Sequence, residues 1–115
     1  MTTHRAYQVR SAIAGLLLCL PAIAQAADTI GVKSKGKQLL QENCARCHSV
    51  ERSGKSALSA APPMRDIYSR LATRELQAEL SEGAVSRHKE MPQISFSDED
   101  VYAILTYLHS IRTRK

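Results

Sequence analysis

Two cysteines and a histidine lie within five consecutive residues of this 115-residue chain, in the order Cys44-Ala45-Arg46-Cys47-His48. On a helix, residues three and four apart share one face, so both thiols and the imidazole would project from the same side. Cys-x-x-Cys-His is the attachment motif of c-type haem. The motif therefore predicts one covalently bound haem c, held by Cys44 and Cys47, with His48 as an axial iron ligand.

Three other interpretations of the motif are weaker. A structural zinc site would need four ligands, and no second cysteine pair or spaced histidine pair follows. A thioredoxin-like redox pair would need a βαβ context, which the sequence lacks, and the third alternative is a chance occurrence. The chain has one Phe and no Trp. Because small domains often need a cofactor for stability, a buried porphyrin would supply the missing apolar body.

A cleaved secretory signal is predicted over residues 1–27. A basic start is followed by an apolar run at 12–24 and by the small residues Ala-Gln-Ala-Ala at 24–27, which is the order that signal peptidases accept. We therefore expect a single domain over 28–115, exported to the periplasm.

Two alternatives to cleavage are disfavoured. A retained membrane anchor would need roughly 20 apolar residues, and this run has about 13. A lipid anchor at Cys19 would need a small residue where Leu18 stands. The sequence thus predicts no stable membrane anchor after cleavage.

The charge of the predicted domain favours protein partners. Without Arg5 and Arg10, 14 basic residues face 11 acidic ones, a net charge of +3. Nucleic-acid binding would need a clustered basic stripe with stacking aromatic residues, and neither is present. A small positive charge instead suits a partner with an acidic docking face.

Helical periodicity runs through the predicted domain, and no strand pattern appears. We expect helices over 34–47, from Pro62-Pro63, from an N-cap at Thr73 to Gly83, and from a cap at Ser97. Residues 50–61 and 84–96 lack periodicity and are expected to be irregular. The buried stripes are Met64, Ile67, Tyr68 and Leu71, then Leu76 and Leu80, then Val101, Ile104, Leu105, Leu108 and Ile111. The predicted fold class is all-α, with three to five helices.

These features together resemble the class I c-type cytochromes, over nearly all of 28–115. Gly36 and Leu40 stand eight and four residues before the motif, where that family packs its first helix across its last. Tyr107-Leu108 resembles the partner for that crossing. The resemblance implies the class I cytochrome c fold and a periplasmic one-electron carrier, which is not an enzyme.

The same resemblance implies the remaining site residues. The segment Ala61-Pro62-Pro63-Met64 looks like the one whose proline carbonyl accepts a hydrogen bond from the haem histidine, so Pro62 would be the acceptor for His48. The segment from His88 to Pro92 looks like the Met-Pro loop of short bacterial members, which implies Met91 as the sixth iron ligand. A thioether ligand also favours Fe(II) on chemical grounds.

Several nearby residues have a simpler interpretation. Met64 lies on an apolar stripe and is expected to fill the core, whereas His88 could compete with Met91 as a ligand but lies in a polar run. His109 is expected to be exposed and without function. The absence of Trp leaves Arg65 and Tyr68 as candidate donors to the haem propionates.

Basic residues near the predicted haem edge raise a further hypothesis. Arg46 lies inside the motif, and Arg87 and Lys89 lie close to Met91. These charges could steer an acidic redox partner toward the haem edge.

Two alternative functions stay open at this point. The chain could be a cytochrome subunit or dedicated electron donor of a periplasmic oxidoreductase complex, which would change its partner but not its chemistry. It could also be a five-coordinate haem protein that binds a gas or peroxide, although Met91 would then have to leave the iron free.

Overall fold

A computed structural model describes residues 20–83 and 90–112, with side chains described from residue 28 onward. It contains four helices: α1 (Leu20–Asn43), α2 (Met64–Arg70), α3 (Thr73–Glu82) and α4 (Asp98–Ile111). No strand occurs within these described ranges. The all-α prediction with three to five helices is therefore confirmed, and residues 50–61 form a loop, as expected.

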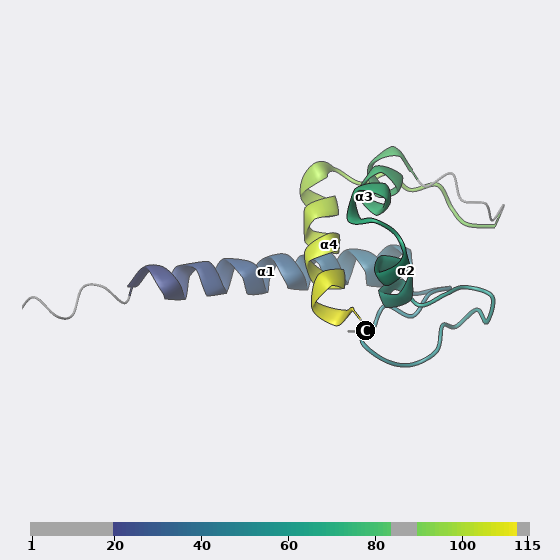
Figure 1. Cartoon of the computed structure of the whole chain (residues 1–115), viewed down its shortest axis with the longest axis horizontal. Helices are drawn as coiled ribbons and strands as arrows, with labels where there is room; N and C mark the ends of the chain where they lie inside the picture. Colours follow the sequence, from purple (N-terminus) through teal and green to yellow (C-terminus); the bar gives the residue numbers. More distant parts are fainter. Residues whose placement is uncertain (1–19, 84–89, 113–115) are drawn as a thin grey trace, which may run out of the picture.

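Helices α1 and α4 cross at a steep angle and form the centre of the fold (Figure 1). The crossing requires glycine at position 36, because a Cβ there would overlap the carbonyl oxygen of Ala103 and lie 2.9 Å from the backbone nitrogen of Ile104. The predicted crossing is present. Its closest approach falls about one turn before Tyr107 and Leu108, which are buried in the same core as Leu40.

Each of the four helices and the loop after the motif contribute residues to the core. Its members are Leu40, Val50, Met64, Leu76, Leu80, Val101, Ile104, Tyr107, Leu108 and Ile111. Leu40, Ile104 and Leu108 are fully buried. The predicted stripe of α4 is confirmed, except that Leu105 is only half-buried and Tyr107 is buried as well.

The bounds predicted for the first helix are wrong at both ends. Helix α1 begins at Leu20 instead of Ser34, because residues 22–33 are rich in alanine and contain no proline, and the single Gly31 does not end the helix. The predicted boundary between signal and domain, after Ala27, therefore falls inside α1. The helix ends at Asn43, whose side-chain amide donates a 2.8 Å bond to the Leu39 carbonyl, a local bond that competes with helix continuation.

Three predicted helix ends can be compared directly. Ser97 caps α4 by accepting a 3.2 Å hydrogen bond from the Asp100 backbone nitrogen, as expected. Gly83 ends α3 with a φ of +76°, a value that glycine adopts readily. Thr73 is the first residue of α3 and not its N-cap, a position that Ala72 occupies without a side-chain bond.

Within the described ranges, no helix has the length and apolar character needed to cross a bilayer. Arg87, His88, Lys89 and most of the predicted signal lie outside the described residues, so the expectations about them stay predictions.

Candidate functional site

The Cys-x-x-Cys-His motif forms a turn directly after α1. The motif was expected inside the helix, but only one further turn of helical hydrogen bonding continues, from the Cys44 carbonyl to the His48 nitrogen at 2.9 Å. The Cys47 nitrogen also donates to the Cys44 carbonyl, at 3.1 Å. The helix ends here because the nitrogens of Cys44 and Ala45 both bond to the carbonyl of Leu40.

Both cysteines are free thiols and both are half-buried. Burial raises the pKa of the Cys44 thiol to about 11, because desolvation disfavours the charged thiolate. Cys44 therefore stays protonated at neutral pH. Arg46, between the two cysteines, is exposed.

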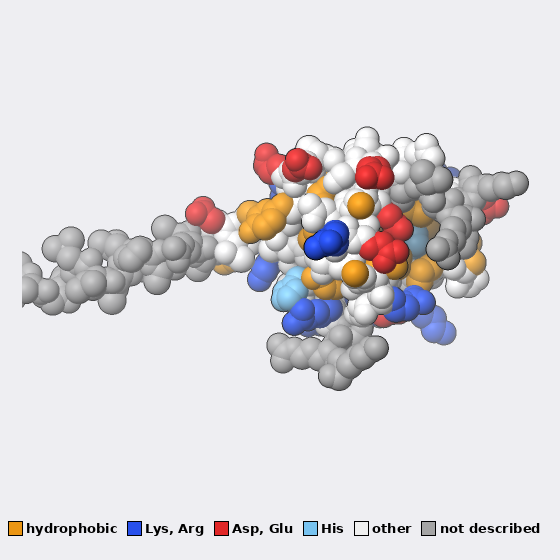
Figure 2. Space-filling model, turned by 45° about the horizontal axis from the view of Figure 1, so that its top comes forward, with side chains coloured by type: hydrophobic (Ala, Val, Ile, Leu, Met, Phe, Trp, Pro, Cys, Tyr) orange, Lys and Arg blue, Asp and Glu red, His pale blue; other side chains and the backbone are white. Residues whose placement is uncertain are grey.

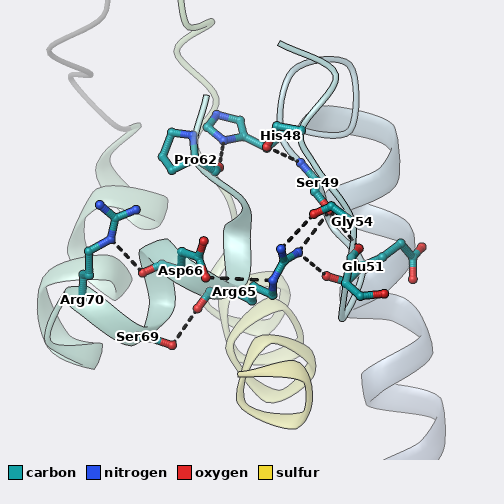
Figure 3. Close-up of polar contacts among 11 residues, drawn as sticks. His48, Ser49, Glu51, Gly54, Pro62, Arg65, Asp66, Ser69 and Arg70 are labelled. Carbon is teal, nitrogen blue, oxygen red and sulfur yellow. Dashed lines mark hydrogen bonds and ion pairs between the residues drawn. The ribbon is translucent and has the colours of Figure 1, made fainter. Parts of the chain in front are cut away.

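The imidazole of His48 is held by the backbone of the segment before α2. Its Nδ1 lies 2.6 Å from the carbonyl oxygen of Pro62 (Figure 3). Because a carbonyl can only accept, Nδ1 carries the proton and donates it, which leaves the lone pair on Nε2. This contact is the one that the resemblance implied for Pro62, and it leaves Nε2 available to bind a metal.

Met64, two residues after Pro62, anchors that segment. Its side chain is 6% exposed and belongs to the core, so the expectation that Met64 fills the core is confirmed. Its backbone nitrogen donates a 2.9 Å bond to the carbonyl of Ser49. The residues after His48 and the residues around Pro62 are thereby joined a second time.

Residues 49–54, called here the post-motif segment, are bonded to α1 and α4. The Tyr107 hydroxyl of α4 donates to the Val50 carbonyl at 2.9 Å. Lys37 of α1 forms an ion pair with Glu51 at 3.0 Å. The Arg52 guanidinium donates to the Ser110 carbonyl, near the end of α4, at 2.7 Å. Helices that lie far apart in sequence therefore hold the chain next to His48.

The two side chains suggested for the propionates have protein partners. The Arg65 guanidinium bonds to three oxygens of the post-motif segment. The Tyr68 hydroxyl lies 3.1 Å from Nδ1 of His109, and Arg112 donates to the same nitrogen at 2.9 Å. His109 is exposed, as expected. Its partnership with Tyr68 was missed, since the two residues are 41 positions apart.

Met91 lies in the irregular segment 90–97 that leads into α4. Its side chain is 38% exposed and lies outside the core. The end of this segment is fixed to α3 by a 2.9 Å bond from the Phe96 nitrogen to the Leu80 carbonyl. The assignment of Met91 as an iron ligand stays a prediction.

The residues around the motif fit a covalently bound porphyrin. Two free thiols and an imidazole with an available Nε2 lie within one turn of chain. Several apolar side chains pack on the core yet keep part of their surface exposed, as a flat apolar cofactor would require: Ile67, Leu71, Phe96 and Leu105. In the described ranges, no three His, Cys, Asp or Glu side chains gather as a set that could bind a metal ion directly.

Residues 34–112 match the family model described as Cytochrome c. The matched range contains every residue assigned to the site, from Cys44 to Met91. Neither a comparison with curated proteins nor one with solved structures gives a match.

Proposed function

The chain belongs to the cytochrome c family, and from that premise we propose that it is a periplasmic carrier of single electrons with His48 and Met91 as the axial iron ligands. Membership of the family implies haem-based electron transfer and covalently bound haem c. The finer statements, on ligands, compartment and partner, are the proposal.

The observation that carries the proposal is the 2.6 Å contact between Nδ1 of His48 and the Pro62 carbonyl. A histidine that binds a metal usually donates its other ring N–H to a carbonyl or carboxylate, which fixes the tautomer and strengthens the donor nitrogen. A surface histidine without such a role has no need of a part-buried backbone acceptor 14 residues away.

Each site residue has one task in this proposal. When haem c is bound, Cys44 and Cys47 would hold it through their sulfurs, His48 would present Nε2 to the iron, and Met91 would supply a thioether ligand. When bound, haem c supplies a one-electron Fe(II)/Fe(III) couple, whose potential depends on the axial ligands and their surroundings. In this proposal the protein itself transforms no substrate, because each site residue only holds the haem or ligates its iron.

The proposed compartment depends on residues 1–27, whose pattern is that of a secretory signal. The proposed partner is a redox protein with an acidic face. Arg46, Arg52 and Lys55 are exposed close to the motif in sequence, while on the face drawn in Figure 2 basic and acidic side chains are interspersed. The proposal of an acidic partner is therefore supported by the exposed basic residues near the motif in sequence and not by the face drawn in Figure 2.

Optical spectra of the purified protein test the ligand assignment. Wild type should show a c-type haem spectrum and, when oxidised, the weak far-red band of a thioether bound to Fe(III). Met91→Leu should lose that band, whereas Met64→Leu is the matched control and should keep it, because Met64 is a core residue. A band that survives Met91→Leu, or a wild type without bound haem, would contradict the proposal.

Partner docking is tested separately. Arg46→Glu should weaken the dependence of the electron-transfer rate on ionic strength when the partner has an acidic face. Arg74→Glu, at an exposed position on α3, is the control that should change it less. Equal effects of both substitutions would argue against docking at the motif.

A further inference from the structure

We propose that Arg65 is a positioning residue, which holds the Pro62 carbonyl against His48 and so sets the donor strength of the imidazole. This inference rests on the proposed function, since it requires His48 to be an iron ligand. Arg65 does not touch the site itself and would act through the backbone on either side of it.

The guanidinium of Arg65 spans the post-motif segment (Figure 3). Its Nη2 donates to the Gly54 carbonyl at 2.8 Å, and its Nη1 donates to the Glu51 carbonyl at 3.1 Å and to the Ser49 hydroxyl at 3.3 Å. The side chain is 14% exposed, and its ion pair with Asp66 is long, at 3.9 Å. Three bonds from a group with five N–H donors are therefore directed at the residues that follow His48.

The two ends of this contact lie next to the two partners of the short hydrogen bond. Ser49 is adjacent to His48, and Arg65 is three residues after Pro62. Pulling Arg65 and the post-motif segment together therefore presses the donor and acceptor together. The bond from the Met64 nitrogen to the Ser49 carbonyl acts in the same direction.

Packing alone does not hold this region. A cavity of about 430 Å³ is lined by loop residues between 54 and 61, by Pro62 and Pro63, and by Arg65 itself. Residues 51–55 are all exposed. Val50 and Met64 pack into the core at the edge of this region, and the rest of the two segments is joined by polar contacts, of which Arg65 makes three.

The consequence is electronic as well as structural. A short bond from Nδ1–H to a carbonyl makes the imidazole a stronger donor at Nε2, which favours Fe(III) and lowers the reduction potential. Without Arg65 the two segments can move apart, so the bond weakens and the potential rises.

The experiment compares haem-loaded variants that are expressed from the full-length sequence. Arg65→Met removes all three bonds, and Arg65→Lys keeps the charge but cannot span three acceptors. Arg70→Met is the matched control, because Arg70 lies on the same helix and its Nε bonds only within that helix, to the Asp66 carbonyl at 3.2 Å. The readouts are the reduction potential and the rate at which the Nδ1 proton of His48 exchanges with water, measured by NMR in the reduced protein.

Arg65→Met should raise the potential and speed the ring-proton exchange several-fold, Arg65→Lys should do both to a smaller extent, and Arg70→Met should do neither. Should Arg65→Met fail to accumulate, Ser49→Ala replaces it, because that change removes one acceptor and leaves two. Unchanged potential and exchange in the Arg65 variants, or equal changes in Arg70→Met, would overturn the inference. Failure of the proposed function is distinguishable, because wild type itself would then lack a histidine-ligated haem.

Discussion

The hydroxyl of Tyr107 in α4 donates a 2.9 Å hydrogen bond to the carbonyl of Val50, two residues after His48. Both residues are buried, so the bond is made away from water. Tyr107→Phe should lower the free energy of unfolding by about 1–2 kcal/mol, because the Val50 carbonyl loses its donor. Tyr102→Phe, on the same helix but 65% exposed, is the control and should change it by less than about 0.5 kcal/mol. Equal denaturation midpoints for the two variants would refute this.

Gly36 permits the close approach of α1 and α4. Gly36→Ala should destabilise the protein by about 1–3 kcal/mol, the usual cost of overpacking, because the added methyl meets the backbone of Ala103. Gly31→Ala in the same helix has open space around the new Cβ and should be neutral or stabilising by up to about 1 kcal/mol. Thermal unfolding of both variants measures the difference, and a Gly36→Ala protein as stable as wild type would contradict the crossing geometry.

The raised pKa of the Cys44 thiol should make the free energy of unfolding depend on pH in the haem-free chain only. Its pKa is raised by burial from 9.0 to about 11, so the folded state binds this proton more tightly than the unfolded state does. The corresponding stability is present below pH 9 and is lost as pH rises through about 11. Denaturant unfolding of the haem-free chain between these values should show the loss. Cys44→Ala should reduce this loss of stability at high pH. The haem-loaded protein should not show the loss, because a thioether does not titrate.

The lowered pKa of the Asp100 carboxyl should make the free energy of unfolding depend on pH in the acidic range. Its pKa is lowered, first by the hydrogen bond from Lys35 and then by the one from Ser97. The contribution to stability is therefore present above the ordinary carboxyl range and is lost as pH falls through the lowered pKa. NMR titration should show Lys35→Met shifting the Asp100 pKa upward, while Lys33→Met leaves it in place. No difference between these variants would mean that Lys35 does not hold the carboxylate.

Local sequence signals predicted much of the fold. Ser97 and Gly83 mark helix ends because their chemistry acts within a few residues, and the apolar spacing of α4 identified most of its buried face. The start of α1 was missed because a predicted cleavage site at 24–27 does not stop a helix, and the alanine-rich sequence continues through it. The spacing of apolar residues also predicted that the motif lies inside the helix. The helix ends before the motif, because the backbone nitrogens of Cys44 and Ala45 both bond to the Leu40 carbonyl.

The site residues could be predicted from sequence only where they belong to a motif or to a segment that resembles the family. The Cys44–His48 motif is contiguous, so its chemistry is legible in sequence. The contact between His48 and Pro62 came from the resemblance alone, since no local rule pairs a histidine with a proline carbonyl 14 residues later. The sequence suggested Arg65 as a donor to the haem propionates, and its contacts to the post-motif segment were missed because its acceptors are carbonyls and a hydroxyl that only the folded loop brings together.

The post-motif segment is fastened to α1, α2 and α4 at once, by Lys37, Arg65, Tyr107 and its own Arg52. Because three helices bind this segment, it can move away from the domain only when those contacts break and the helices separate. The Ser49 amide, which donates to the Ser56 hydroxyl at 3.0 Å, should thus exchange hydrogen slowly, through separation of those helices. Solvent exposure is a poor guide to mobility here, since an exposed loop is held by contacts to three helices.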